Sequence, residues 1–147
     1  MTVLLQLDVS PHCAQVALVD ATWRDHPQWE TGQEQVVFGA ESLTDPGNSP
    51  SPGFAVATRP DWGPDGACTV RVEVWSDDEP AGLRCIHQGV MHVGSQGAVV
   101  GNDQSGSMTE LALAAGVHRL RIFADAEASR DVSRVVFVLS EPDTTDA

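Results

Sequence analysis

The sequence predicts an all-β fold: a single-domain antiparallel β-sandwich of about eight strands joined by long loops. Apolar and polar residues alternate in most of its apolar runs, which is the period of a half-buried strand. Outside one ambiguous segment near residues 107–115, no stretch repeats at the helical period, and 13 glycines and 9 prolines supply many turns. The 147 residues fit one domain. We predict that residues 1–140 form the sandwich and that residues 141–147 form a disordered acidic tail.

The first half of the chain contains four predicted strands. They are residues 3–9, 15–20, 54–58 and 69–75. The clearest is the last, in which Val70, Val72 and Val74 alternate with polar residues. A helix would scatter these valines around its axis, whereas a strand places them on one face. We therefore expect the three valines in the core and Trp75 packed on the opposite face.

The second half contains three more predicted strands. They are residues 83–93, 117–124 and 135–139. Gly89 lies inside the first of them and suggests a bulge, because glycine within a strand often marks one. The last run is apolar throughout, which is typical of a central strand covered on both faces. Residues 45–53 and 61–66 are rich in Gly, Pro, Asp and Ser and are predicted as loops.

One segment, residues 107–115, has two interpretations. Ser107 and Glu110 fit a helix capping box and Gly116 fits a helix C-cap, which would give a short helix. Leu111 and Leu113 also alternate with alanines, which fits a strand that turns at residues 115–116 into the next strand. We favour the strand and keep the short helix as the alternative.

The charge of the chain restricts its partners. Asp and Glu number 21 against 8 basic residues, all of them arginine, so the formal net charge is -13. A chain this acidic repels phosphate backbones and anionic membranes, so we expect neither nucleic-acid nor membrane binding. The same charge suits a basic protein partner, such as a nuclease with a positive groove. The first residues lack the basic start of a signal peptide, and no apolar run is long enough to span a membrane, so we expect a cytoplasmic protein.

The residues that usually carry catalysis or hold metals form no recognisable motif. The chain has no nucleotide-binding, metalloprotease, nucleophile-elbow or calcium-loop pattern. Cys13, Cys68 and Cys85 are odd in number and form no paired motif, so we expect buried free thiols. His87 and His92 are five residues apart on one strand, and an odd spacing sends them to opposite faces. We therefore expect no catalytic residue, no metal and no cofactor.

Two loops supply candidate partner-binding residues. An acidic run lies before Pro80, and it serves either as a solvated tip or as a contact for a basic partner. Trp62 lies in a predicted loop between two acids, where a tryptophan either closes one end of the core or anchors a partner. The predicted partner-binding residues are Asp61, Trp62, Asp65, Asp77, Asp78 and Glu79.

The order of the segments carries a family resemblance. A strand ends near Val9, the strand 15–20 follows, a Trp-containing loop leads to residues 53–55 (Gly-Phe-Ala), and residues 111–121 come near the C-terminus. This layout, over about residues 3–140, resembles the competence-type nuclease inhibitors, the ComJ-like proteins, and related small bacterial proteins of unknown function. The resemblance implies an all-β protein that binds and blocks a nuclease.

Together these observations predict a non-enzymatic, acidic protein-binding module. Its most concrete form is an immunity-type inhibitor of a basic toxin or nuclease. The alternatives are a structural or accessory subunit of a larger assembly and a ligand-binding β-sandwich.

Overall fold

A computed structural model describes residues 2–11, 14–23, 37–39, 52–63, 66–102 and 107–140. This part of the chain contains strands and two 3-10 helices, η2 (Ala21–Trp23) and η3 (Ser129–Asp131), and no α-helix, so the predicted all-β class is confirmed. The strands are β1 (Thr2–Val9), β2 (Gln15–Asp20), β3 (Val37–Gly39), β4 (Gly53–Ala57), β5 (Trp62–Gly63), β6 (Gly66–Ala67), β7 (Val70–Ser76), β8 (Arg84–Val93), β9 (Ala98–Asn102), β10 (Ser107–Leu111), β11 (Gly116–Ala124) and β12 (Arg134–Leu139).

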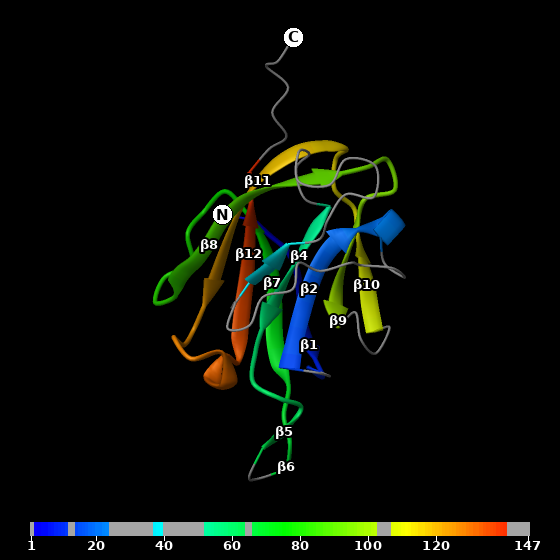
Figure 1. The fold of residues 1–147 in the computed structure, drawn as a ribbon. Coiled ribbons are helices and arrows are strands. Elements are labelled where there is room, and N and C mark those ends of the chain that lie inside the picture. The colour runs from blue at the N-terminus through cyan, green and yellow to red at the C-terminus, as the bar shows by residue number, and fades with distance from the viewer. Residues whose placement is uncertain are drawn as a thin grey trace.

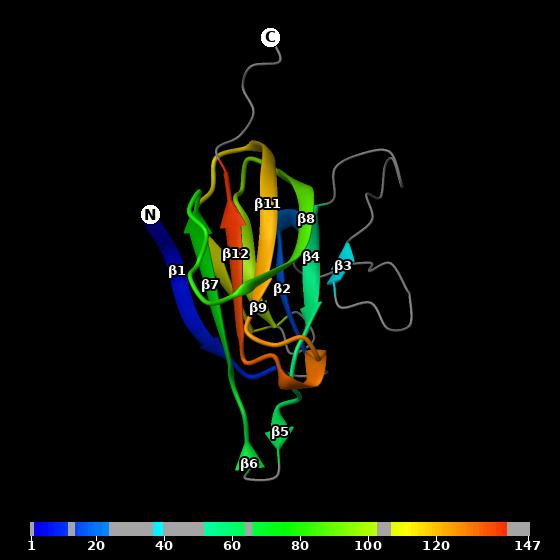
Figure 2. The same cartoon turned by 90° about the vertical axis from the view of Figure 1, so that its left-hand side faces the viewer.

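Two five-stranded sheets face each other (Figure 1). The first sheet has the order β1-β7-β12-β11-β8 and the second has the order β10-β9-β2-β4-β3. The short strands β5 and β6 pair only with each other, and they project beyond one end of the sandwich (Figure 2). We call this end the hairpin end and the other end, where β7 and β12 stop, the opposite end.

The main core lies between the sheets. The first sheet contributes Val70, Val72 and Val74 from β7, all fully buried as predicted, and the second sheet contributes Val16 and Leu18 from β2. Strand β12 is buried along both faces, because alternate residues enter the main core and a second cluster on the outer face. The members of this outer cluster are Trp75, Phe123, Val136 and Val138, with Leu83 packed against them. Trp75 is therefore packed and β12 is central, as the sequence predicts.

The strand pairing contains one feature that the predicted antiparallel sandwich lacks. Strand β12 pairs with β7 in parallel, although the other pairs in both sheets are antiparallel. Between them the chain forms β8 to β11, which visit both sheets, so β12 returns beside β7 by a long crossover rather than a hairpin.

The segment 107–115 is a strand at its start, not the alternative short helix. Residues 107–111 form β10, which pairs with β9 at the edge of the second sheet. The expected hairpin into the next strand does not form, because β11 belongs to the first sheet. The residues between β10 and β11 instead carry the chain from one sheet to the other, and Leu111 and Leu113 both pack on the core.

Two bulges correct the predictions that Val3, Leu5, Leu7 and Val9 share one face and that the bulge of the 83–93 strand lies at Gly89. In β1 the register shifts between Val3 and Leu5, so Val3 lies opposite Trp75 and Leu5 lies opposite Val74. Directly opposed residues share a face, and Val3 therefore leaves the core-facing set. In β8 the bulge lies at Ile86 instead of the predicted Gly89, which pairs regularly with the strand beside it.

Several predictions concern segments outside the described residues. The predicted loop 45–51, the second acid of the Trp62 loop and the predicted tail 141–147 belong to them. The described residues include no helix of the length and apolarity needed to cross a membrane.

Candidate functional site

The predicted Trp62 loop is a small β-hairpin with an exposed aromatic side chain. Trp62 pairs with Ala67, and Gly63 pairs with Gly66. Its side chain is 69% exposed, the largest value among the exposed large hydrophobic residues that the structure describes. The residue therefore does not close the end of the core, which was one of its two predicted roles. An exposed tryptophan on a projecting hairpin has the geometry of an anchor for a protein partner.

Hydrogen bonds hold the base of this hairpin. The backbone N–H of Cys68 donates to the carbonyl oxygen of Asp61 at 2.7 Å. Arg59 donates from Nε to the carbonyl oxygen of Thr69 at 2.9 Å, and its own N–H donates to the carbonyl oxygen of Val132 at 3.0 Å. Two of these bonds join the two arms of the hairpin, and the bond to Val132 ties one arm to the sandwich. A contact loop that is held in this way loses less conformational freedom on binding.

The acidic run lies in the connection that follows β7. Asp77, Asp78 and Glu79 are all exposed. Asp77 has a positive φ of 65°, a conformation that aspartate tolerates better than most residues. Its N–H donates to the carbonyl oxygen of Leu139 at 3.0 Å, and its carbonyl oxygen accepts from Arg121 Nη2 at 2.8 Å. The start of the acidic run is therefore fixed to the end of the first sheet.

The structure does not bring the two groups of predicted residues together. Asp61 and Trp62 lie at the hairpin end, and the acidic run lies at the opposite end of β7 (Figure 2). The seven residues of β7, at about 3.3 Å each, separate them by roughly 20 Å. Asp65, the remaining predicted contact, is not among the described residues.

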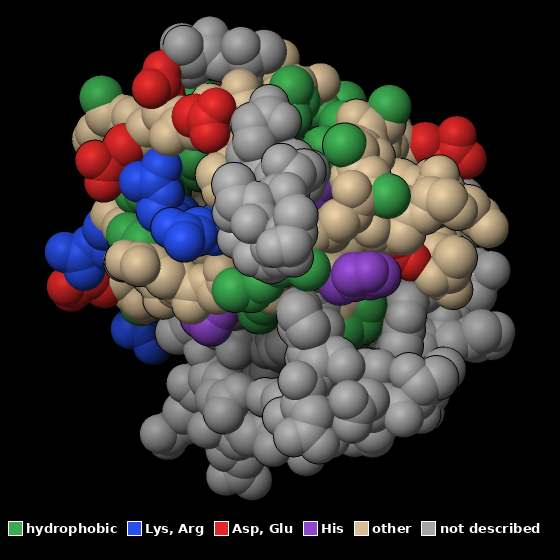
Figure 3. Space-filling view, turned by 90° about the horizontal axis from the view of Figure 1, so that it is seen from above, with side chains coloured by type: hydrophobic (Ala, Val, Ile, Leu, Met, Phe, Trp, Pro, Cys, Tyr) green, Lys and Arg blue, Asp and Glu red, His purple; other side chains and the backbone are tan. Residues whose placement is uncertain are grey.

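The structure places two arginines of the predicted strand 117–124 beside the acidic run, which the sequence did not predict. Figure 3 views the opposite end and shows basic side chains gathered next to acidic ones. Arg119 and Arg121 lie on the outer face of β11, and Arg121 donates to the carbonyl oxygen of Asp77 at the start of the acidic run. The alternation within residues 117–124 places these arginines on one face of the strand. The order of strands in the sheet decides that this strand lies beside the acidic run. The electrostatic potential around the acidic run is therefore not purely negative, because positively charged side chains lie beside it.

Strand β8 carries Cys85, His87 and His92, and Cys68 follows the β5–β6 hairpin. His87 and His92 lie on opposite faces of β8, as predicted, because the bulge precedes both of them. The ring of His87 packs against Phe54 with ring centroids 5.1 Å apart, and desolvation there lowers the pKa of His87 below its ordinary 6.5. The predicted buried thiols are corrected at two positions: Cys68 is half-buried and Cys85 is exposed. Among the described residues, no group of three or more His, Cys, Asp or Glu could hold a metal ion.

Comparison with known proteins shows a likeness of fold. No protein-family model matches the chain, and neither does any curated protein sequence. The chain is similar to the crystal structure of ComJ from Bacillus subtilis, described as an inhibitor of the DNA degrading activity of NucA. The TM-score is 0.59 at 10% sequence identity, and the likeness covers 95% of this chain and 97% of ComJ. The resemblance predicted from the sequence is confirmed at the level of the fold.

Proposed function

We propose that this chain is a non-enzymatic inhibitor that binds a basic nuclease and blocks it by protein–protein contact. The observation that carries the proposal is the likeness of almost the whole chain to a structure whose protein inhibits a nuclease. The net charge of -13 suits a partner with a positive groove, since complementary charge speeds association and selects partners.

The β5–β6 hairpin is the proposed contact element. Its support is the exposure of Trp62 and the hydrogen bonds that hold Asp61 and the other base residues in place. Tryptophan is enriched among the few residues that dominate binding energy. The acidic run Asp77–Glu79 lies too far away to join the same small contact, so its proposed role is long-range steering of the encounter.

Capture of the partner is the first test. The protein is used as bait in an extract of its source cells, and the bound proteins are identified by mass spectrometry. We expect a basic nuclease whose DNA cleavage falls when the purified protein is added. Capture of a non-nuclease assembly would favour the accessory-subunit alternative instead.

The role of Trp62 is then measured with the captured nuclease. We expect Trp62→Ala to cost about 2 kcal/mol, which corresponds to roughly a 30-fold faster dissociation. The matched control is Val90→Ala, because Val90 is also an exposed apolar residue, at 40%, but lies on β8. Equal dissociation rates for both variants, in proteins that remain folded, would show that the hairpin is not part of the contact with the nuclease.

Steering is tested separately. Asp77→Asn, Asp78→Asn and Glu79→Gln are combined in one variant and its association rate is measured at low and high salt. We expect slower association at low salt and a smaller loss at high salt, because salt screens exposed charges. An association rate unchanged at low salt would show that the acidic run does not steer the partner and is only a solvated tip.

A further inference from the structure

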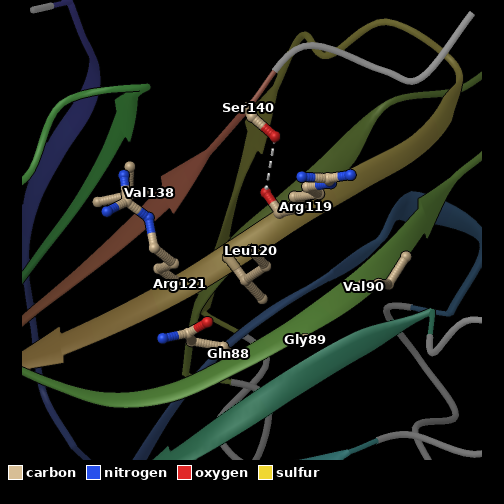
Figure 4. A pocket seen from close by; sticks show the side chains of 8 residues that line it. All are labelled: Gln88, Gly89, Val90, Arg119, Leu120, Arg121, Val138 and Ser140. Atoms are coloured by element: carbon tan, nitrogen blue, oxygen red, sulfur yellow. Dashed lines mark hydrogen bonds between the residues drawn. The ribbon is translucent and has the colours of Figure 1, made fainter.

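A pocket of about 440 Å³ lies on the outer face of the first sheet (Figure 4). It extends over β8, β11 and β12, toward the opposite end of the sandwich from Trp62. Its volume falls in the range of pockets that hold small molecules, about 300–1,000 Å³. The polar side chains of its lining are Gln88, Arg119, Arg121 and Ser140, and the apolar ones include Val90 and Val138.

Neighbouring contacts set the positions of two polar lining residues. Arg121 donates to the carbonyl oxygen of Asp77 and lies over the ring of Phe123, with its guanidinium carbon 5.6 Å from the ring centroid. The Ser140 N–H donates to the carbonyl oxygen of Arg119 at 3.0 Å. A ring nitrogen of His118 lies 3.1 Å from the carbonyl oxygen of Ser140. These contacts hold Arg121 and the backbone of Ser140 in place before any ligand arrives.

Within the described part of the chain, Arg119 differs from most other arginines because its guanidinium group contacts no carbonyl or carboxylate oxygen. Of the arginines that the structure describes, Arg59, Arg84, Arg121 and Arg134 each donate to a carbonyl or carboxylate oxygen, and Arg71 forms an ion pair with Asp8. The guanidinium groups of Arg119 and Arg130 have no such partner among the described residues. Arg130 lies on η3, outside the pocket, whereas Arg119 lines it.

We propose that this pocket binds a small organic anion and that Arg119 holds the phosphate or carboxylate group of that molecule. A guanidinium presents parallel N–H donors that match two oxygens of either group. Arg121 adds a second positive charge from the same strand face, and Val90, which is 40% exposed, covers an apolar part of the ligand. This proposal is independent of the nuclease contact, because the pocket and Trp62 lie at different ends of the molecule.

Binding is tested with inorganic phosphate, acetate and chloride as probes at equal ionic strength. We expect phosphate or acetate to shift the backbone amide NMR signals of residues 88–90 and 119–121, with little response to chloride. A stronger response to phosphate would indicate a phosphorylated ligand, and a stronger response to acetate would indicate a carboxylate. Equal responses to all three probes would show general charge screening and would overturn the proposal.

Two variants assign the site. Arg119→Ala should weaken the binding of the preferred anion at least tenfold, and Arg119→Lys should restore part of it, because lysine keeps the charge without the planar fork. Arg130→Ala is the matched control and should bind as the unaltered protein does. Arg119 contacts Ser140 only through its backbone oxygen, so the altered side chain leaves that hydrogen bond in place. Equal weakening in Arg119→Ala and Arg130→Ala would overturn the assignment.

Discussion

Val72 and Val3 lie on neighbouring strands, and they differ completely in exposure. Val72 is fully buried in the main core, whereas Val3 is 43% exposed. The bulge at Leu4 is the cause, because it turns Val3 to the outer face of β1 while Val72 keeps the regular alternation of β7. Two valines in the same sheet are therefore expected to contribute very differently to the free energy of unfolding.

The two valines give a direct test of this difference. Val72→Ala should lower the free energy of unfolding by about 1–3 kcal/mol, since it removes buried methyl groups and leaves a cavity. Val3→Ala should change it by less than about 0.5 kcal/mol, as surface substitutions usually do. Urea unfolding of both variants measures these costs. A loss below half a kcal/mol for Val72→Ala, or a helical circular-dichroism spectrum, would contradict the fold.

At the scale of elements, a single carboxylate organises the connection between β11 and β12. Asp125 follows β11 directly and accepts hydrogen bonds from the N–H of Ser133 at 2.9 Å and from the N–H of Arg134 at 3.1 Å. The Ser133 hydroxyl donates to its other oxygen at 2.5 Å. Desolvation by burial acts to raise the pKa of Asp125, but these hydrogen bonds outweigh it and lower the pKa below its ordinary 3.8.

This lowered pKa predicts a pH dependence with a definite sign. A carboxylate with a lower pKa in the folded state stabilises the fold above its unfolded pKa, and the effect is lost as the pH falls through the folded value. Asp125→Asn should therefore cost about 1 kcal/mol at neutral pH. The difference from the unaltered protein should shrink below about pH 5. Denaturant melts between pH 7 and pH 3 measure it, and a difference that does not change with pH would contradict the assignment.

At the scale of the whole molecule, the uneven distribution of charge is the main feature. Four of the eight arginines, Arg71, Arg119, Arg121 and Arg134, share the outer face of the first sheet in a chain of net charge -13. The ion pairs Arg71–Asp8 and Arg134–Glu73 neutralise two of them locally. A basic partner therefore meets less attraction on this face than elsewhere, which favours its approach to other surfaces.

The whole molecule is also expected to fold without a metal. The described residues offer no cluster of metal ligands, and 147 residues suffice for a stabilising core. A chelator should leave the melting temperature of the purified protein within about 1 °C of its untreated value. A drop of many degrees, together with stoichiometric zinc in the untreated sample, would show a metal that contributes to folding.

The alternation of residues was sufficient to identify the fold class and most long strands. Val70, Val72 and Val74 could be assigned to one face from spacing alone, because the pleat of a strand is a local property. The uniformly apolar run of β12 also identified it as a central strand, because a strand covered on both faces has apolar residues at every position. The short β9 was missed, since its apolar run Ala98–Val100 is bounded by glycines and resembles a turn region.

Properties that depend on distant segments required the tertiary structure. The parallel pairing of β12 with β7 and the crossing from β10 to β11 are choices of sheet order, which strand periodicity does not encode. Trp62 and the acidic run are close in sequence but lie at opposite ends, because the length of β7 separates them. Arg119 and Ser140 are far apart in sequence but line one pocket, because β11 and β12 are hydrogen-bonded neighbours. Local chemistry determines which residues form strands, and the packing of the two sheets decides which residues meet.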